Sequence, residues 1–381
     1  MPDKHAVLSA SSSERWINCP PSARLCERVE DKPSSYAAEG TVAHAKAEEK
    51  LRNWKEGHPR KRVKCPNGEM DEATTDYRDY VIEIFNAEKK KCNITDLYIE
   101  VQLDLNKWIA EGFGTSDAVV VSDNCLHVID FKYGAGVPVS AEHNSQLMLY
   151  AAGAMDMYEC LYDFDTIMLH IFQPRMGNIS EWELTTEELN KWLEEVVRPQ
   201  AILAWNGQGE HKPGAWCRFC KVSVTCKARA KANMAVAAED KRLDGMLLSD
   251  KEIAELLPQL PEIQKWCKDL QDYALQEAMN GTEYDGYKVV EGRSLRKIAD
   301  ERAALQKLED AGYQREAVTV TKLNTITNLE KLLGKKQFTE IMGDTVYKPP
   351  GAPTLVPESD KRPPIKEALA MEAWGDELGD K

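Results

Sequence analysis

The sequence predicts an α/β protein with a large N-terminal domain at residues 1–240 and a smaller, mainly helical region at residues 241–347. First, a chain of 381 residues is too long for one ordinary domain. Second, apolar and polar residues alternate from about 96 to 103, and residues 164–173 form an apolar run, both typical of strands. Third, segments rich in Ala, Glu and Lys, such as residues 36–56 ahead of the first strand, favour helices.

The remaining elements follow in order along the chain. In the first domain, further helices are expected at residues 73–91, 142–158, 185–206 and 227–243, and further strands at 117–122 and 125–132. In the second region, helical segments are expected at 250–280, 300–311 and 325–342, and a short strand at 286–291. Residues 348–366 carry six prolines and precede an acidic stretch, so residues 348–381 are expected to form an extended tail.

Composition limits the classes of function. Lys and Arg number 49 and Asp and Glu 63, giving a net charge of −14. Such an acidic chain will not coat DNA indiscriminately, so any contact with nucleic acid requires local basic patches or a bound metal. No apolar run has the length of a membrane span, and the N-terminus lacks the apolar core of a signal peptide. A soluble, cytoplasmic protein without a membrane partner is expected.

The most informative segment is GFGTSDAVVVSDNCLHVIDFKYG, residues 112–134. Asp123 and Asn124 form a good turn between two apolar runs, which predicts a β-hairpin. In that register Asp117 faces Asp130, and directly opposed side chains have β-carbons about 4.5–5.5 Å apart. Lys132 lies two residues beyond Asp130 and shares its face. Two carboxylates and a lysine are therefore expected to converge on one patch.

This patch predicts metal chemistry. Burying two like charges side by side is costly unless a cation neutralises them, and a hard divalent ion such as Mg²⁺ or Mn²⁺ prefers oxygen ligands. The lysine can then orient an attacking water or stabilise charge on a phosphate. The competing interpretation is a surface hairpin with solvated charges. Because Val119, Val121, Val128 and Ile129 are apolar, a core hairpin is favoured.

Two flanking features add candidate residues. Gln146 and Tyr150 are four positions apart and share one helix face, and His44 follows Gly40 and Thr41 near the start of a helix. Taken singly, His44 is better explained as a helix-surface histidine, and the other pair as a helix face that packs on the sheet.

Taken together, these motifs resemble the RecB-type branch of the PD-(D/E)XK nucleases. The ordered set is GTVAH at 40–44, GTSD at 114–117, DFK at 130–132 and QLMLY at 146–150, and the resemblance spans about residues 9–230. It implies a restriction-endonuclease-like core, in which helices flank a mixed central sheet. It also implies that His44, Asp117 and Asp130 hold the metal, that Lys132 serves hydrolysis, and that Gln146 and Tyr150 line the DNA-facing side. Glu39 and Glu48 are additional candidate ligands.

The ten cysteines fall into two groups. Cys65, Cys92, Cys125, Cys160 and Cys267 are scattered as ordinary buried thiols usually are. Cys217, Cys220 and Cys226 lie close together in sequence and offer three thiolates, whereas Zn²⁺ or a [4Fe–4S] cluster needs four. Cys19, within WINCP, is the best fourth ligand, and Cys26 is its rival.

The cysteine arrangement resembles the iron–sulfur nucleases, including AddB-type helicase–nucleases and the CRISPR adaptation nucleases. In those proteins one cysteine precedes the nuclease core and three follow it. The resemblance implies a [4Fe–4S] cluster on Cys19, Cys217, Cys220 and Cys226, with a structural Zn²⁺ as the alternative.

These observations lead to an expected function. The chain is expected to be a Mg²⁺- or Mn²⁺-dependent deoxyribonuclease. It also resembles an uncharacterised family of phage genomes, often encoded beside replication genes. That resemblance implies an exonuclease of phage DNA replication or recombination, in the host cytoplasm, with DNA and a single-strand-binding or other phage replication protein as partners. A basic segment with Arg293, Arg296 and Lys297 is a candidate phosphate contact, although a solvated surface explains it equally well.

Two alternative functions remain open. One is a non-catalytic or partner-dependent DNA-binding module with a nuclease-like fold. The intact Asp-x-Lys set argues against it, because a dead site would tolerate its loss. The other is a restriction-like, sequence-specific endonuclease, for which no recognition domain is evident.

Overall fold

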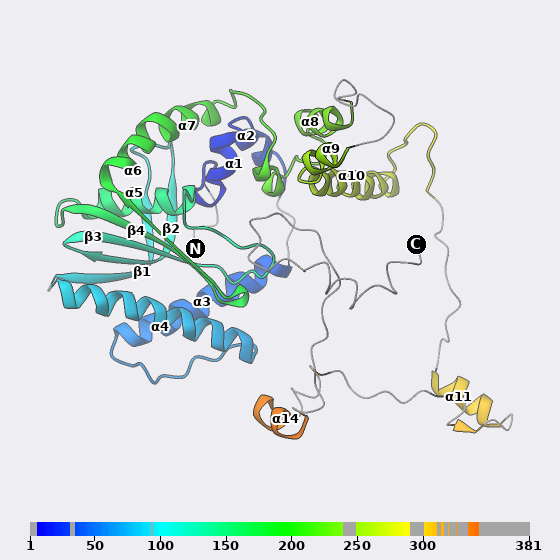
Figure 1. Cartoon of the computed structure of the whole chain (residues 1–381), viewed down its shortest axis with the longest axis horizontal. Helices are drawn as coiled ribbons and strands as arrows, with labels where there is room; N and C mark the ends of the chain where they lie inside the picture. Colours follow the sequence, from blue (N-terminus) through cyan, green and yellow to red (C-terminus); the bar gives the residue numbers. More distant parts are fainter. Residues whose placement is uncertain are drawn as a thin grey trace. The chain divides into compact units, whose positions relative to one another are not determined.

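A computed structural model describes residues 6–30, 35–92, 94–238, 249–289, 301–310 and 334–342, with Gln314, Arg315, Thr319 and Ile326. The chain divides into two compact units, residues 1–290 and 291–381. The predicted domain boundaries at 240 and 347 stay predictions. The first unit contains the sheet and every candidate residue that is described below (Figure 1).

A five-stranded mixed sheet forms the centre of the first unit. Its strands lie side by side in sequence order: β1 (Thr95–Asp104), β2 (Phe113–Ser122), β3 (Asn124–Phe131), β4 (Phe164–Gln173) and β5 (Asn178–Thr185). Neighbouring strands are antiparallel except β3 and β4, which are parallel and are joined by the crossover helix α5 (Ser145–Tyr158). This architecture confirms the predicted α/β fold with a mixed central sheet flanked by helices.

Helices cover both faces of the sheet (Figure 1). On one face, α3 (Ser35–Lys55) and α4 (Gly68–Lys91) enclose a core that includes Tyr77, Ile129 and Phe131. On the other face, α5 packs over a larger core that includes Val119 and Val128. The short helices α1 (Ser13–Asn18) and α2 (Ser22–Glu27) pack against α7 (Arg198–Trp205), which follows α6 (Thr186–Trp192) and a π-helical turn at Leu193–Val197.

The other described helices follow the sheet domain or lie in its loops. They are α8 (Lys227–Ala238), α9 (Asp250–Leu256), α10 (Leu260–Met279), α11 (Glu301–Asp310) and α14 (Lys335–Met342), with 3₁₀ turns at Ala10–Ser12, Pro174–Met176 and Ala215–Phe219. Pro258 lies between α9 and α10, so the helical segment expected at 250–280 is divided in two. None of the described helices is both long and apolar enough to span a bilayer.

The β2–β3 register agrees with the prediction. Residues pair from Ser122 with Cys125 to Ala118 with Ile129, so the next opposed residues in this register are Asp117 and Asp130. Asn124 adopts φ +72°, a left-handed conformation that asparagine tolerates better than most residues, and it lets the chain reverse. The turn therefore fixes which carboxylates meet.

Strand β1 changes face in its middle, which the alternating sequence does not indicate. Leu97 and Ile99 pack in the core under α3 and α4, whereas Leu103 packs in the core under α5. Between them Glu100 has φ +49°, a conformation that costs an L-residue about 1–2 kcal/mol. This residue lies opposite Asp117 in the register and is absent from the regular pairing.

Two further differences from the predicted elements have physical reasons. β5 was not predicted, because it is an edge strand of which only Leu184 is buried, and its sequence lacks an apolar run. The strand expected at 286–291 is wrong for residues 286–289, which form a turn and irregular chain, and its remainder lies outside the described residues. The expected tail at 348–381 also lies outside them.

Candidate metal and hydrolysis site

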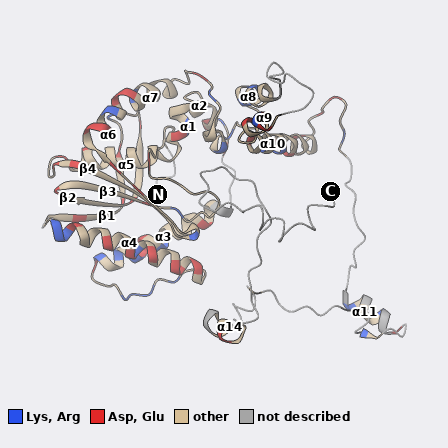
Figure 2. Cartoon of the chain, in the orientation of Figure 1, with Lys and Arg blue, Asp and Glu red and all other residues tan. Residues whose placement is uncertain are grey.

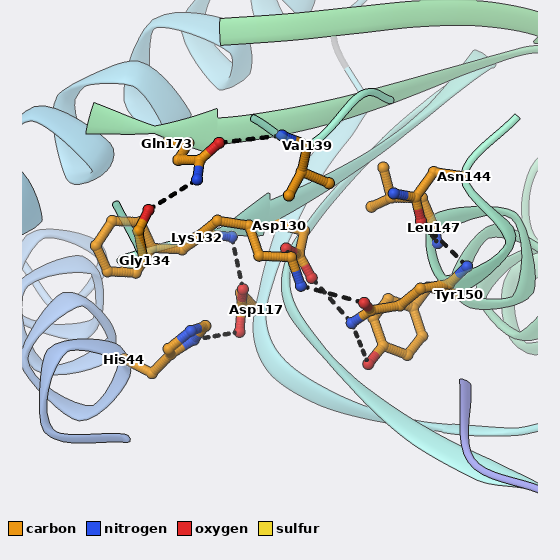
Figure 3. Close-up of polar contacts among 12 residues, drawn as sticks. His44, Asp117, Asp130, Lys132, Gly134, Val139, Asn144, Leu147, Tyr150 and Gln173 are labelled. Carbon is orange, nitrogen blue, oxygen red and sulfur yellow. Dashed lines mark hydrogen bonds and ion pairs between the residues drawn. The ribbon is translucent and has the colours of Figure 1, made fainter. Parts of the chain in front are cut away.

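The middle of β2 and the end of β3 bring the predicted carboxylates and lysine together (Figure 3). Lys132 Nζ lies 3.0 Å from Asp130 Oδ2, and the Asp130 side chain is only 5% exposed. Although the ammonium is close, this buried oxygen accepts no hydrogen bond of good geometry from the described residues. An oxygen with an unused lone pair, facing a second carboxylate, is suited to a cation.

Gln146 and Tyr150 join the same cluster from α5. Gln146 donates from Nε2 to Asp130 Oδ1 and to the Tyr150 hydroxyl, both at 3.1 Å, and its Oε1 accepts from Lys132 Nζ at 3.1 Å. The side chain of Asn144 caps α5 by accepting from the backbone N–H groups of Gln146 and Leu147. The cap fixes the first turn, so Gln146 is held between the carboxylate and the lysine.

The segment after Lys132 is also anchored. The Lys132 backbone N–H donates to Phe172 O, and Gln173 at the end of β4 donates to Gly134 O and accepts from Val139 N–H. These bonds hold the loop that leads from β3 to α5, as Figure 3 shows. The backbone that carries the Lys132 side chain is therefore fixed by hydrogen bonds at Lys132 itself and at Gly134 and Val139.

His44 reaches the site from α3 on the opposite face of the sheet. Its Nδ1 lies 2.9 Å from Asp117 Oδ1, and Asp117 Oδ2 accepts from the Phe131 backbone N–H at 2.7 Å. The His44 ring also packs edge-on against the Phe131 ring, with centroids 5.3 Å apart. Helix α3, β2 and β3 thus meet at Asp117, and the interpretation of His44 as an isolated surface histidine is not needed.

The structure adds Glu100, which sequence reasoning missed. Ligand atoms of His44, Glu100 and Asp117 all lie within 4.8 Å of one another, close enough to share one ion. The left-handed backbone at Glu100 directs this carboxylate into the site, and no sequence pattern signals such a conformation. Among the described residues, the other two candidate ligands each have an ion-pair partner: Glu39 pairs with Arg175, and Glu48 pairs with Arg52.

Negative charge predominates among the side chains of the site, and it raises the pKa values of several of them. Burial alone would lower the pKa of His44, but the carboxylates of Asp117 and Asp130 outweigh it and raise that pKa to about 9. Burial, with the charges of Asp117 and Glu48, raises the pKa of Glu100 to about 7. Burial likewise raises the pKa of Asp130, with a further contribution from Asp117. Without an ion, the site takes up protons to offset its carboxylates.

The predicted cysteines converge in a second region, between α1–α2 and the segment before α8. Cys19, Cys217, Cys220 and Cys226 line one cavity together with Arg15 and His211. The rival ligand Cys26 is buried, and its Sγ lies 3.7 Å from Cys220 Sγ. The hydrogen bond from Cys220 lowers the pKa of the Cys26 thiol to about 6. The fold thus brings all five cysteines near one another, although they come from both ends of the domain.

The other cysteines and the basic segment need separate mention. Cys65, Cys92 and Cys125 are partly buried, whereas Cys160 and Cys267 are exposed, so the expectation that they are mostly buried is wrong for these two. Arg293, Arg296 and Lys297 lie outside the described residues. Their expected contact with phosphates stays a prediction.

Comparisons with known proteins give a family without an assigned activity. A family described as "Protein of unknown function (DUF2800)" matches residues 5–363. Among solved structures, one titled "Crystal structure of SSO0001" is 16% identical, and the match covers 57% of this chain and 96% of that one with a TM-score of 0.24. A similarity at that level supports no functional argument.

Proposed function

Because the chain belongs to the DUF2800 family, whose description gives no activity, we propose from the site alone that it is a metal-dependent deoxyribonuclease of the PD-(D/E)XK type. The observation that carries the proposal is the set Asp117, Asp130 and Lys132, completed by Gln146, in which Asp130 is buried and the other three are half-buried. Asp130 Oδ2 has a free lone pair that suits a cation with a preference for oxygen ligands. The Lys132 ammonium beside it suits a phosphate.

The ligands of the proposed ion are His44, Asp117, Asp130 and the newly found Glu100. Mg²⁺ or Mn²⁺ bound there supplies Lewis-acid activation of a phosphoryl oxygen and of water. Binding requires that His44 lose its proton, since only the neutral ring is a ligand. The proton that His44 holds and the added metal are therefore alternatives, because each neutralises the same carboxylates, which raise the pKa of His44.

Each remaining residue has a defined task. The Lys132 ammonium contacts Asp130 and Gln146, and it lies where it can hold a water or stabilise charge on a phosphate during cleavage. Gln146 keeps Asp130 and Lys132 in register by bonding to both. Tyr150 anchors Gln146 from one turn further along α5. The set fits hydrolysis of a phosphodiester bond without a covalent enzyme intermediate.

A nuclease assay tests this proposal. The purified full chain is incubated with linear, nicked and covalently closed circular DNA in Mg²⁺, Mn²⁺ or EDTA, and products are resolved by size. Cleavage that needs the metal is expected, with nucleotide release from linear ends if the enzyme is an exonuclease of replication or recombination. Asp130→Asn should abolish it, while Asp123→Asn, in the turn of the same hairpin, should not. Metal-dependent cleavage that survives at full rate in Asp130→Asn excludes this site.

The cysteine region is proposed to hold a [4Fe–4S] cluster. Cys19, Cys217, Cys220 and Cys226 line one cavity and offer the four thiolates that such a cluster needs. The cluster is proposed to be structural, because the cavity is lined by none of the residues assigned to hydrolysis, namely Asp117, Asp130, Lys132, Gln146 and Tyr150. By analogy with a covalent cross-link, closing the long loop between Cys19 and Cys217 contributes on the order of 4–5 kcal/mol to the free energy of unfolding, by restricting the unfolded chain.

Anaerobic purification tests the cluster. Brown protein with four irons per chain is expected, and Cys217→Ser should lose both colour and stability. The exposed Cys160 provides the control, because Cys160→Ser should change neither. Iron content that persists in Cys19→Ser but not in Cys26→Ser transfers the fourth position to Cys26, whose sulfur is close to Cys220. Zinc bound by four sulfurs identifies the alternative structural ion.

A further inference from the structure

A second polar cluster lies at the opposite end of β3 from the hydrolytic site. Cys125 and His127 are two residues apart on the strand, and Glu88 comes from the last turn of α4. Their ligand atoms all lie within 4.8 Å of one another. His127 Nε2 is 3.3 Å from Cys125 Sγ and 3.4 Å from Glu88 Oε1. Glu88 and His127 are buried, so their charges and lone pairs have little access to water.

These separations match a tetrahedral zinc site. With Zn–N of about 2.0–2.1 Å, Zn–S of about 2.3 Å and Zn–O of about 2.0–2.2 Å, tetrahedral angles place nitrogen about 3.6 Å from sulfur and about 3.4 Å from oxygen. A zinc ion can therefore enter between the three side chains with shifts of a few tenths of an ångström. The mixture of thiolate, imidazole and carboxylate suits zinc better than Mg²⁺, which demands oxygen ligands.

A chain of hydrogen bonds orients the histidine. The Tyr80 hydroxyl donates to Glu181 Oε1 at 2.6 Å and lies 2.9 Å from His170 Nδ1, and His170 Nε2 lies 3.0 Å from His127 Nδ1. Because the Tyr80 hydroxyl donates to Glu181, its oxygen accepts from His170 Nδ1–H. His170 Nε2 then accepts from His127 Nδ1–H, and both rings are neutral. His127 then presents a bare Nε2 lone pair to the Glu88 carboxylate.

In this tautomer His127 Nε2 and Glu88 Oε1 face each other at 3.4 Å with no proton between them, and their present partners are the Cys125 thiol and the exposed Lys91 ammonium. A zinc ion that replaces the thiol proton and displaces the lysine would coordinate both atoms. Ligating histidines in proteins usually donate their other ring N–H to a fixed partner, as His127 does to His170 here. Ser122 donates to the second oxygen of Glu88 and so orients the carboxylate as well.

We propose that Glu88, Cys125 and His127 bind one Zn²⁺ ion, with water at the fourth position. The thiolate and carboxylate together balance the ion's charge. The Lys91 ammonium bonds to Glu88 Oε1 at 2.6 Å, and its side chain is 71% exposed, so it can move into solvent when the ion binds. The ion ties the end of α4 to the start of β3. This site is independent of the proposed nuclease activity.

Zinc binding is tested on the full chain after dialysis against a chelator and addition of one equivalent of Zn²⁺. Zinc K-edge X-ray absorption should show one sulfur and one imidazole per ion, and iron elsewhere in the chain does not interfere. Competition with a chromophoric chelator should give a zinc affinity that falls at least tenfold in Cys125→Ser and in His127→Gln, with unchanged circular dichroism. Cys160→Ser, which alters an exposed thiol, should keep wild-type affinity.

Three results overturn the proposal. The first is an absorption spectrum with four sulfurs per zinc, which assigns the ion to the cysteines near α1 and α8. The second is affinity unchanged in both variants. The third is no zinc retained by the folded wild-type chain at micromolar concentration. Absence of nuclease activity would leave the zinc measurement unaffected, so failure of one proposal is distinguishable from failure of the other.

Discussion

The two ends of β3 carry polar clusters of opposite character. At its end, Asp130 pairs with Lys132 and lies opposite Asp117 in the register. Ligand atoms of Asp117 cluster in turn with those of His44 and Glu100, so carboxylate oxygens dominate this end. At its start, Cys125 and His127 meet a single carboxylate, Glu88. One eight-residue strand thus offers a hard, oxygen-rich site and a softer, mixed site. Ligand type rather than position in the fold decides which ion each would select.

The histidines at the two ends respond to pH in opposite directions. Carboxylates around His44 raise its pKa to about 9, so this end favours the charged ring. Burial, together with the neighbouring His127, lowers the pKa of His170 to about 4, so the other end favours the neutral ring. A histidine in the interior of the fold can therefore be a proton store or a fixed hydrogen-bond relay, depending on whether nearby carboxylates outweigh the effect of burial on its pKa.

The largest expected effect is on the rate of cleavage when Lys132, at the oxygen-rich end of β3, is replaced. Lys132→Ala should lower metal-dependent cleavage about 10²–10³-fold, because a preorganised charge near the developing negative charge is lost. Zinc bound at the other end should be unchanged. Initial rates of cleavage and zinc content are measured on the same samples. Lys107→Ala removes an exposed lysine that pairs with Asp156 and should leave both at wild-type values. A joint loss of rate and zinc would show that the two ends are not independent.

Next is the pH dependence of stability in protein stripped of divalent ions. The folded-state pKa of His44, about 9, lies above an unfolded value of about 6.5. Its contribution, on the order of 2 kcal/mol, is present below pH 6.5 and lost as pH rises to 9. The pKa of His170, about 4, lies below the unfolded value, so its contribution is present above pH 6.5 and lost as pH falls to 4.

Urea unfolding between pH 4 and 9 measures both arms. His44→Gln should flatten only the alkaline arm, and His170→Gln only the acid arm. If His44→Gln also flattens the acid arm, the two histidines titrate as one group, and the claim that they act in separate pH ranges is wrong.

A smaller effect concerns Glu100 and its left-handed backbone. Glu100→Gln should weaken Mg²⁺ activation of cleavage about tenfold, because one candidate oxygen ligand is lost. Glu100→Gly should weaken it similarly while stabilising the fold by about 1 kcal/mol, since glycine adopts positive φ without strain.

Glu111 provides the matched control. It has φ +53° on an exposed loop, so Glu111→Gly should also stabilise the fold but leave Mg²⁺ activation unchanged. The Mg²⁺ concentration for half-maximal cleavage and the urea midpoint distinguish the two positions. Equal Mg²⁺ dependence in Glu100→Gln and the wild type would remove Glu100 from the ligand set.

The smallest effect probes the strand between the two clusters. Ile129 is fully buried between Cys125 and Phe131, on the side of α3 and α4. Ile129→Val should cost about 1 kcal/mol of stability through one lost methylene group. Neither zinc affinity nor cleavage should change, because the backbone register is kept. A change in either would mean that packing at this position couples the two sites.

Much of the oxygen-rich site was predictable because its residues follow a strand and a turn. The turn at Asp123 and Asn124 set the register, and with it the meeting of Asp117 and Asp130. Glu100 could not be predicted, since a positive φ at a glutamate has no sequence signature. The cluster of Glu88 with His127 was also invisible, because its members lie on a helix and a strand with no fixed spacing. Sequence periodicity reports faces of single elements, whereas such sites arise from packing between them.

The crossover between β3 and β4 leads us to expect that the strands of the sheet pair in a fixed order during folding. Strands β1, β2 and β3 follow one another through short connections, whereas β4 pairs with β3 only after the chain has passed through α5. Local hairpins form faster than parallel pairs that require long loops to close. Asp117 and Asp130 are therefore expected to meet before Gln146 arrives to bind Asp130, and the repulsion between the two carboxylates opposes early pairing of β1, β2 and β3. Mg²⁺ in the refolding buffer should consequently raise the folding rate of the wild type, and stopped-flow refolding should show no such acceleration in Asp130→Asn.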